Sequence, residues 1–387
     1  MSMKKFTKKM LAIVAAGAMT MGLAMPVFAE GAGTTTKEAY ITKVFNTEVA
    51  KNVDFTFSAE QQKNGGSVNN LVDTDAVVTI QKAEFKTTEG TGTLTKRWAV
   101  TFPTYEEAGK YSYKVTETGN SLNLDDTGEK EKMLMSKAEY LMDVYVSNTT
   151  AGGYEISNIV VSKTKNDKGE ADSTTGKVNI SNGDNNGFKF ENTYVQEAGT
   201  GTDPTTPGDD YNKFGSLNVS KKVKNANSET RETAQSFNFT ATFSFPAGTD
   251  ASTLGGVKAD GKDITLAGDK KDTYTFTMND GKSVKFTGLP VGTTISVNEA
   301  ATQNYKGSAV VTINGTPENV AVGYNTALSV SNKKLGQNKN AVDVTNTYNN
   351  VPTTGIIMNT LPYVLMVALC GAALVAFVAS KRRKVQK

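Results

Sequence analysis

The stretch FENTY, at residues 190–194, and its counterpart VTNTY, at residues 344–348, indicate the fold. In both, the first and last residues are apolar or aromatic and lie four positions apart, so they point to the same face of a β-strand. The central asparagines, Asn192 and Asn346, share a face with the apolar residues two positions away. Because a buried amide needs a hydrogen-bonding partner, each asparagine predicts a polar partner inside a β-fold.

A lysine segment and a glutamate segment precede each asparagine segment in the same order. The first copy has ITK at residues 41–43 and YKVTE at residues 113–117. The second copy has VSK at residues 219–221 and ISVNE at residues 295–299. The chain therefore repeats one plan in which Lys, Glu and Asn follow one another.

Strand alternation places all six polar side chains of the two copies on apolar faces. Buried without partners, each would cost several kcal/mol of stability. Either the agreement is accidental and the groups lie at the rim of each domain, or the three side chains of each copy meet. We expect them to meet as two triads: Lys43, Glu117 and Asn192, and Lys221, Glu299 and Asn346.

Between its two ends the chain consists of short segments rich in Val, Thr, Phe and Tyr, separated by Gly, Asn and Asp. This pattern predicts an all-β protein, and about 325 residues of it predict two domains. We place the domains at residues 37–195 and 214–349, with a linker at residues 196–213. The first domain has an extra segment, residues 121–140, whose charged part from Asp125 to Tyr140 could hold a short solvated helix.

The N-terminus is typical of a secretory signal peptide. Four lysines precede an uncharged run that ends in Val-Phe-Ala at residue 29, which fits a small-residue cleavage site. We therefore expect residues 1–29 to be removed on secretion. A permanent N-terminal membrane helix is the less favoured alternative, because an acidic, Gly-rich stretch follows.

The C-terminus combines three features at residues 351–387. The pentapeptide VPTTG occupies residues 351–355, residues 355–380 carry no charge, and five basic residues follow. The uncharged run is long enough to cross a bilayer, and the basic tail predicts a cytoplasmic end. Without the pentapeptide this would indicate an ordinary single-span anchor.

This three-part order resembles the LPxTG-type cell-wall sorting signal of Gram-positive surface proteins, with Val351 where Leu is commoner. The resemblance implies that a sortase thiolate attacks the carbonyl of Thr354 and releases the chain from Gly355 onward. The protein would then be secreted and joined covalently to the cell wall, after a transient membrane-bound stage.

Composition excludes several kinds of function from the part between the ends. Residues 30–354 hold 33 Lys and Arg against 39 Asp and Glu, a formal charge of −6, which gives nucleic-acid binding no support. The chain has no His, and its one cysteine, Cys370, lies in the anchor. We therefore expect no disulfide, no metal site of the usual zinc type and no cofactor.

Both repeated segments resemble the streptococcal-type pilin isopeptide-linkage domain, which is related to the Cna B-type sandwich. The resemblance covers nearly all of residues 37–349 and implies two tandem immunoglobulin-like β-sandwiches. It also implies that a Lys on the first strand forms an amide with an Asn on the last, assisted by a Glu. The corresponding residues are Lys43, Asn192 and Glu117, and Lys221, Asn346 and Glu299.

Physical chemistry agrees with this implied reaction. Desolvation lowers the pKa of a buried Lys, whose neutral amine is a nucleophile, and raises the pKa of a buried Glu, whose protonated form can polarise the Asn carboxamide. Ammonia leaves, and the site is consumed in one turnover. The expected activity is self-modification, and no other catalytic constellation supports an enzyme.

The resemblances together predict a major pilin that forms a pilus shaft. The expected partners are sortase, other pilin subunits and peptidoglycan, and further partners could be host surface or matrix proteins. The alternative is a monomeric wall-anchored adhesin or a pilus base subunit. The lysine that accepts the next subunit is left open among Lys163, Lys165, Lys168, Lys177 and others, because no pilin motif marks it.

Overall fold

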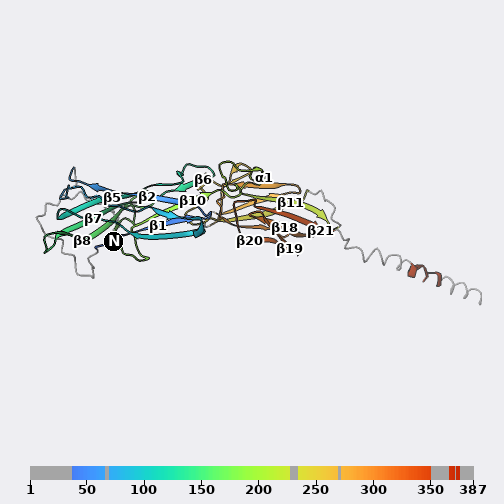
Figure 1. Ribbon diagram of the computed structural model, residues 1–387. Coiled ribbons are helices and arrows are strands. Elements are labelled where there is room, and N and C mark those ends of the chain that lie inside the picture. The colour runs from blue at the N-terminus through green and yellow to red at the C-terminus, as the bar shows by residue number, and fades with distance from the viewer. Residues whose placement is uncertain are drawn as a thin grey trace, which may run out of the picture. The chain divides into compact units, whose positions relative to one another are not determined.

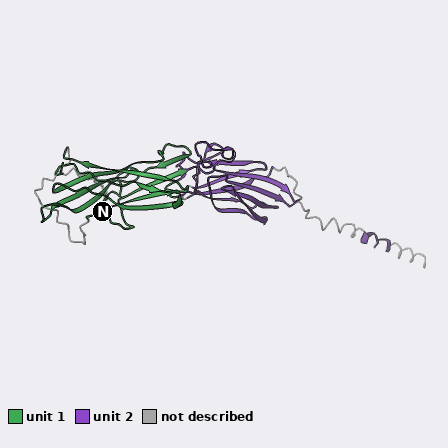
Figure 2. Ribbon diagram, in the orientation of Figure 1, with its two compact units in different colours: residues 1–195, 247–249 green, residues 196–246, 250–387 purple. Residues whose placement is uncertain are grey.

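The computed structural model is drawn in Figure 1 and describes residues 37–65, 69–226, 234–268, 272–349, 366–370 and 372–374. Strands form almost all of its regular structure, so the predicted all-β class is confirmed. The chain divides into two compact units, which Figure 2 colours separately. Unit 1 contains residues up to 195 and residues 247–249, and unit 2 contains residues 196–246 and those from 250 onward.

Unit 1 is a sandwich of two sheets. The smaller sheet has the order β4 (Gly92–Ala99), β1 (Tyr40–Thr47), β10 (Lys189–Gln196), β6 (Glu131–Leu134). The larger sheet has the order β3 (Ala83–Phe85), β2 (Val53–Gln62), β5 (Gly109–Asn120), β7 (Glu139–Asn148), β8 (Tyr154–Lys165), β9 (Gly176–Val178). One buried cluster takes Ile41 and Phe190 from the smaller sheet and Tyr113 and Val144 from the larger, so the core lies between the sheets.

Unit 2 is also built from two sheets. The larger has the order β14 (Lys262–Asp263), β13 (Lys258–Ala259), β16 (Ser283–Thr287), β11 (Leu217–Asn225), β21 (Ala341–Tyr348), β18 (Tyr305–Ile313), β19 (Thr316–Tyr324). The smaller has the order β15 (Thr273–Met278), β12 (Phe237–Ser244), β17 (Thr294–Glu299), β20 (Leu328–Lys334). The rings of Phe243 and Phe286, one from each sheet, meet at 5.5 Å inside the core.

In each unit the first strand and the last strand are neighbours. The strand β1 pairs in parallel with β10, and β11 pairs in parallel with β21. Residues that are far apart in the sequence therefore lie side by side in the middle of a sheet. A covalent bond between these strands would join the two ends of a unit directly.

The extra segment of unit 1 differs from the prediction made for it. No helix occurs between Asp125 and Tyr140, and the segment instead supplies β6 and the start of β7. Met133 of β6 is fully buried and β6 lies next to β10. An apolar side chain and an open strand edge beside β10 outweigh the charged composition that suggested a solvated insertion.

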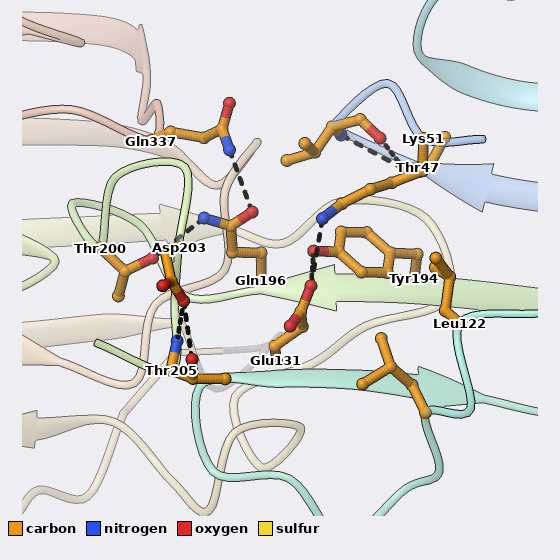
Figure 3. A network of polar contacts seen from close by, with 12 residues as sticks. Thr47, Lys51, Leu122, Glu131, Tyr194, Gln196, Thr200, Asp203, Thr205 and Gln337 are labelled. Carbon is orange, nitrogen blue, oxygen red and sulfur yellow. Dashed lines mark hydrogen bonds and ion pairs between the residues drawn. The ribbon is translucent and has the colours of Figure 1, made fainter. Parts of the chain in front are cut away.

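The segment predicted as a linker, residues 196–213, begins as part of unit 2. Gln196 and Ala198 are buried, and Gln196 Nε2 donates hydrogen bonds to Thr200 Oγ1 and to the Gly201 carbonyl. Its Oε1 accepts from Gln337 Nε2 at 3.0 Å, as Figure 3 shows. The helix α1 (Asp209–Phe214) ends the segment. Polar side chains with specific partners hold the start of the segment in place, where no large apolar residue precedes Tyr211.

Polar contacts also fix the end of β10 within unit 1. The Tyr194 hydroxyl donates to Glu131 of β6, and Lys51 forms an ion pair with the same carboxylate at 3.1 Å (Figure 3). The ammonium group of Lys51 lies 4.6 Å from the centre of the Tyr194 ring. The side chains of Lys51 and Glu131 are 22% and 15% exposed, so this cluster stabilises β6 against β10 near the surface.

Several predictions concern residues outside those that the structure describes. These are the signal peptide at residues 1–29, the sorting pentapeptide with Thr354 and Gly355, and the basic tail. Of the predicted membrane segment, residues 366–370 and 372–374 are helical. Within the described parts of the chain, no helix is both long enough and apolar enough to cross a membrane.

Candidate functional site

Lys43, Glu117 and Asn192 meet inside unit 1, although they come from three strands. Lys43 Nζ lies 3.0 Å from both oxygens of the Glu117 carboxyl group. Asn192 Nδ2 donates to Glu117 Oε1 at 2.7 Å. The side chains of Lys43 and Glu117 are 0% exposed, and Asn192 is equally buried. Glu117 therefore bridges an amine and a carboxamide away from water.

Strand register brings the lysine within reach of the asparagine. The β10 residue that faces Lys43 precedes Asn192 by two positions, an offset of about 6.6 Å along the strand. The same offset separates Lys221 from Asn346 on β11 and β21. In a parallel pair these residues share a face, and the long lysine side chain extends along the strand toward the carboxamide.

Unit 2 repeats the triad with one difference in the glutamate contacts. Lys221 Nζ lies 2.7 Å from Glu299 Oε1, and Asn346 Nδ2 donates to the same oxygen. All three residues are at most 3% exposed. Among the described residues, Glu299 Oε2 and Asn346 Oδ1 are buried and have no hydrogen-bond partner.

Each lysine amine also faces an aromatic ring on the strand that follows it. Lys43 Nζ lies 4.4 Å from the centre of the Phe55 ring on β2, and Lys221 Nζ lies 3.9 Å from that of Phe237 on β12. These rings exclude water from one side of the amine. The sequence analysis did not identify Phe55 or Phe237, whose matching signal is an aromatic residue on the strand after each lysine strand.

In each triad, burial lowers the pKa of the lysine and raises the pKa of the glutamate. Desolvation lowers the pKa of Lys43 and of Lys221 to about 8, although the nearby glutamates oppose the shift. Burial raises the pKa of Glu117 and of Glu299, against the effect of the lysines. Both shifts favour a neutral amine beside a protonated carboxyl group, which is the pairing that amide formation needs.

The carboxamide of Asn192 has an orientation that the sequence did not predict. Its Oδ1 accepts a hydrogen bond of 2.7 Å from the backbone N–H of Ser136, and its Nδ2 faces Glu117 and, at 3.3 Å, Met135 Sδ. In both units the glutamate therefore contacts the amide nitrogen and not the carboxamide oxygen. Ser136 and Met135 belong to the extra segment, and no sequence motif marks them.

The placement of possible metal ligands bears on one prediction made from the sequence. Across the ranges that the structure describes, no group of three or more His, Cys, Asp or Glu could hold a metal ion. The absence of metals and cofactors remains a prediction for the whole chain. The predicted sortase site at Thr354 and Gly355 lies beyond the described ranges.

Residues 215–348, less than half of the chain, match a family described as a domain of unknown function (DUF7601). No curated protein matches the chain. Among solved structures, the chain is similar to the major pilin of Streptococcus pyogenes, with 22% identity, coverage of 81% of this chain and 100% of the pilin, and a TM-score of 0.32.

Two further solved structures are similar to the chain. A second major pilin of Streptococcus pyogenes has 18% identity, coverage of 81% of this chain and 99% of the pilin, and a TM-score of 0.30. A pilus-presented adhesin has 14% identity, coverage of 54% of this chain and 37% of the adhesin, and a TM-score of 0.26.

Proposed function

We propose that this chain is the shaft subunit of a surface pilus, polymerised and anchored to the cell wall by a sortase. In this proposal each unit is stabilised by an amide that it forms itself between Lys43 and Asn192, or between Lys221 and Asn346. The observation that supports it is the pair of buried Lys-Glu-Asn triads, each placed between adjacent parallel first and last strands.

The proposed bond suits a fibre under tension. Force that enters a unit at one end and leaves at the other would pass through the amide between neighbouring first and last strands, so the unit could not extend. Unlike a disulfide, an amide cannot be reduced, and residues 30–354 contain no cysteine with which to form a disulfide. The reaction is self-modification, because one turnover consumes the lysine and the asparagine.

Polymerisation rests on the sorting pattern at residues 351–387. A sortase would form a thioester with Thr354, and a lysine amine of the next subunit or a peptidoglycan amine would resolve it. The order of pentapeptide, uncharged segment and basic tail supports this step. The same pattern also fits a monomeric wall-anchored adhesin or a pilus base subunit, which could use host surface or matrix proteins as partners.

An intact-mass measurement tests the cross-links. Protein spanning residues 30–350 should be lighter than its sequence by two ammonia molecules, one for each unit. A mass equal to that of the unmodified sequence would show that the triads are only buried ion pairs.

An immunoblot of cell-wall extract tests the polymer separately. A ladder of high-mass species would support a shaft subunit, whereas one discrete band would support the monomeric alternative. Replacing Thr354→Ala should abolish the ladder and leave the protein in the membrane fraction. Normal wall attachment of that variant would contradict the sorting assignment.

A further inference from the structure

We propose that the backbone N–H of Ser136 is the group that activates the Asn192 carbonyl in unit 1, and that unit 2 lacks such a donor. This inference rests on the proposed cross-linking reaction and adds one catalytic group to that reaction. The hydrogen bond from Ser136 N to Asn192 Oδ1 is 2.7 Å long and buried. A backbone N–H can only donate, so it fixes which end of the carboxamide is the oxygen.

Because the orientation of the carboxamide is fixed, Glu117 and the Ser136 N–H have separate roles in the reaction. With Oδ1 on Ser136, the amide nitrogen that must leave is the atom that contacts Glu117, at 2.7 Å. Glu117 is also 3.0 Å from the attacking amine of Lys43. Glu117 is thus placed to move a proton from the nucleophile to the leaving group, and Ser136 is placed to stabilise the oxyanion.

The atoms balance as follows. The lone pair of neutral Lys43 Nζ attacks Asn192 Cγ, and the carbonyl electron pair moves to Oδ1, whose charge the Ser136 N–H stabilises. Protonated Glu117 gives its proton to Nδ2 and takes one from Nζ, so it ends as it began. The Oδ1 electron pair then restores the carbonyl, the Cγ–Nδ2 bond breaks, and ammonia leaves.

The leaving nitrogen has a route out of the unit. Asn192 Nδ2 lies 3.3 Å from Met135 Sδ. Met135 and Ser136 line an open groove of about 620 Å³ that also borders Glu117 and Asn120. Met135 is partly buried and contacts both the amide nitrogen and this groove, so we expect ammonia to leave past its side chain.

A shell of hydrogen bonds holds the Ser136 N–H in its direction. Ser136 Oγ donates to Asp167 Oδ1 at 2.6 Å, and the next backbone donor, Lys137 N, binds the Asp167 carbonyl at 2.9 Å. Asp167 Oδ1 also accepts from the backbone N–H of Glu191, the neighbour of Asn192 on β10. Asp167 is therefore a positioning residue that ties the donor segment to the strand of the reacting asparagine.

Unit 2 has a different arrangement at the equivalent point. The strand beside β21 is β18, and Gly307 pairs with Asn346 there. Within the part of the chain that the structure describes, Asn346 Oδ1 has no hydrogen-bond partner. Turning this carboxamide over would put Oδ1 on protonated Glu299, so in unit 2 the glutamate alone must activate the carbonyl.

The test replaces one N–H by an ester oxygen without changing any side chain. The full chain is made by cell-free translation with the α-hydroxy acid counterpart of Ser136 at that position, and linked peptides from both units are followed over time by mass spectrometry. Loss of one oxyanion donor should slow the Lys43–Asn192 linkage by about 10²–10³-fold. The Lys221–Asn346 linkage in the same molecules should form at an unchanged rate, so it serves as the internal reference.

Two controls separate catalysis from local structure. The same ester placed at Met133 removes a backbone hydrogen bond of similar length, from Met133 N to the Asp125 carbonyl, that touches neither Asn192 nor Asp167, and it should leave the unit 1 rate nearly unchanged. Ser136→Ala keeps the N–H and should slow the linkage far less than the ester at 136. Equal rates for the chain with an ester at 136 and the unmodified chain would overturn the inference, as would equal slowing by both esters. If the unmodified chain forms no linked peptide, the proposed cross-linking itself fails.

Discussion

Lys189, Glu191 and Asn46 repeat the Lys-Glu-Asn combination on the other face of the sheet that carries the unit 1 triad. Lys189 Nζ lies 3.2 Å from Glu191 Oε2, and Asn46 Nδ2 donates to Glu191 Oε1 at 2.9 Å. The connectivity matches that of the buried triad, but the side chains of Lys189 and Glu191 are 38% and 37% exposed. Both side chains are therefore in contact with water, unlike those of Lys43 and Glu117.

The exposed set should not react. Partial burial raises the pKa of Glu191, but hydrogen bonds from Asn46 and Lys189 outweigh it, and the net pKa is lowered, opposite to that of Glu117. Peptide mapping of the cross-linked protein should find the Lys43–Asn192 linkage and no Lys189–Asn46 linkage. A third lost ammonia would show that burial is not what selects the reactive lysine.

The protonation of the triads predicts a maximum in the rate of cross-linking with pH. At low pH the Lys43–Glu117 pair holds both protons and has no free amine, and at high pH it has lost both and the carboxylate cannot donate. The rate should therefore fall above about pH 8, where the lysine pKa lies, and fall again in acid below the raised pKa of Glu117.

Aliquots of fresh cell-free translation product, buffered at a series of pH values, would give this profile by intact mass. A rate that continued to rise well above pH 8 would show that the free amine alone limits the reaction and that no protonated glutamate is needed.

At the scale of elements, the strand next to the last strand distinguishes the two units. In unit 1 that strand is β6, and the segment that follows it supplies the Ser136 N–H. In unit 2 it is β18, where Gly307 faces Asn346. A Cβ at position 307 would lie 3.2 Å from Leu328 Cβ and 3.4 Å from Asn346 Oδ1, so the glycine leaves room for the carboxamide.

Gly307→Ala should slow the cross-link of unit 2 and leave that of unit 1 unchanged. Overpacking costs about 1–3 kcal/mol, and a methyl group against the Asn346 carboxamide opposes the change in geometry at Cγ, so we expect roughly tenfold slowing. The ratio of the two linked peptides over time measures it. Gly119→Ala on β5 is the matched control, because its Cβ would meet only Thr56 Oγ1 at 3.7 Å. Unchanged kinetics in Gly307→Ala would mean that the carboxamide does not need this space.

At the scale of the whole molecule, each cross-link should raise thermal stability. Each proposed bond would close a loop of more than a hundred residues, for which chain entropy gives about 4 to 5 kcal/mol. Glu117→Ala or Glu299→Ala should each retain one ammonia and lower the unfolding temperature of its unit by roughly 10 to 20 °C. Calorimetry and intact mass on the same samples would link the two effects.

The glutamate substitutions also remove the buried partner of the lysine and the asparagine. A second substitution is therefore needed to separate the contribution of the amide bond to stability from that of packing. Adding Asn192→Ala to Glu117→Ala should lower the unfolding temperature little further, because the bond is already absent. Reducing agent should change nothing, since residues 30–354 hold no cysteine. A full additional loss in the double variant would show that packing, and not the amide, gives the stability.

The sequence by itself determined the class of the fold and the membership of the two triads. Alternation of period two and turn residues predict strands without reference to the rest of the chain, and parity puts Lys43, Glu117 and Asn192 on inward faces. It did not predict β6, because charged residues around Met133 gave no periodic signal. It also missed the packing of Gln196 in unit 2, which depends on partners far along the chain.

Only the tertiary structure decided how the triads are arranged and how they differ. Whether first and last strands are neighbours, and which β10 residue faces Lys43, depend on sheet order and register, which local alternation does not encode. The donor to Asn192 Oδ1 is a backbone N–H, and every residue except proline has one, so no residue type could mark Ser136. The difference in burial between the exposed Lys-Glu-Asn set and the buried triad likewise exists only once the sheets have packed.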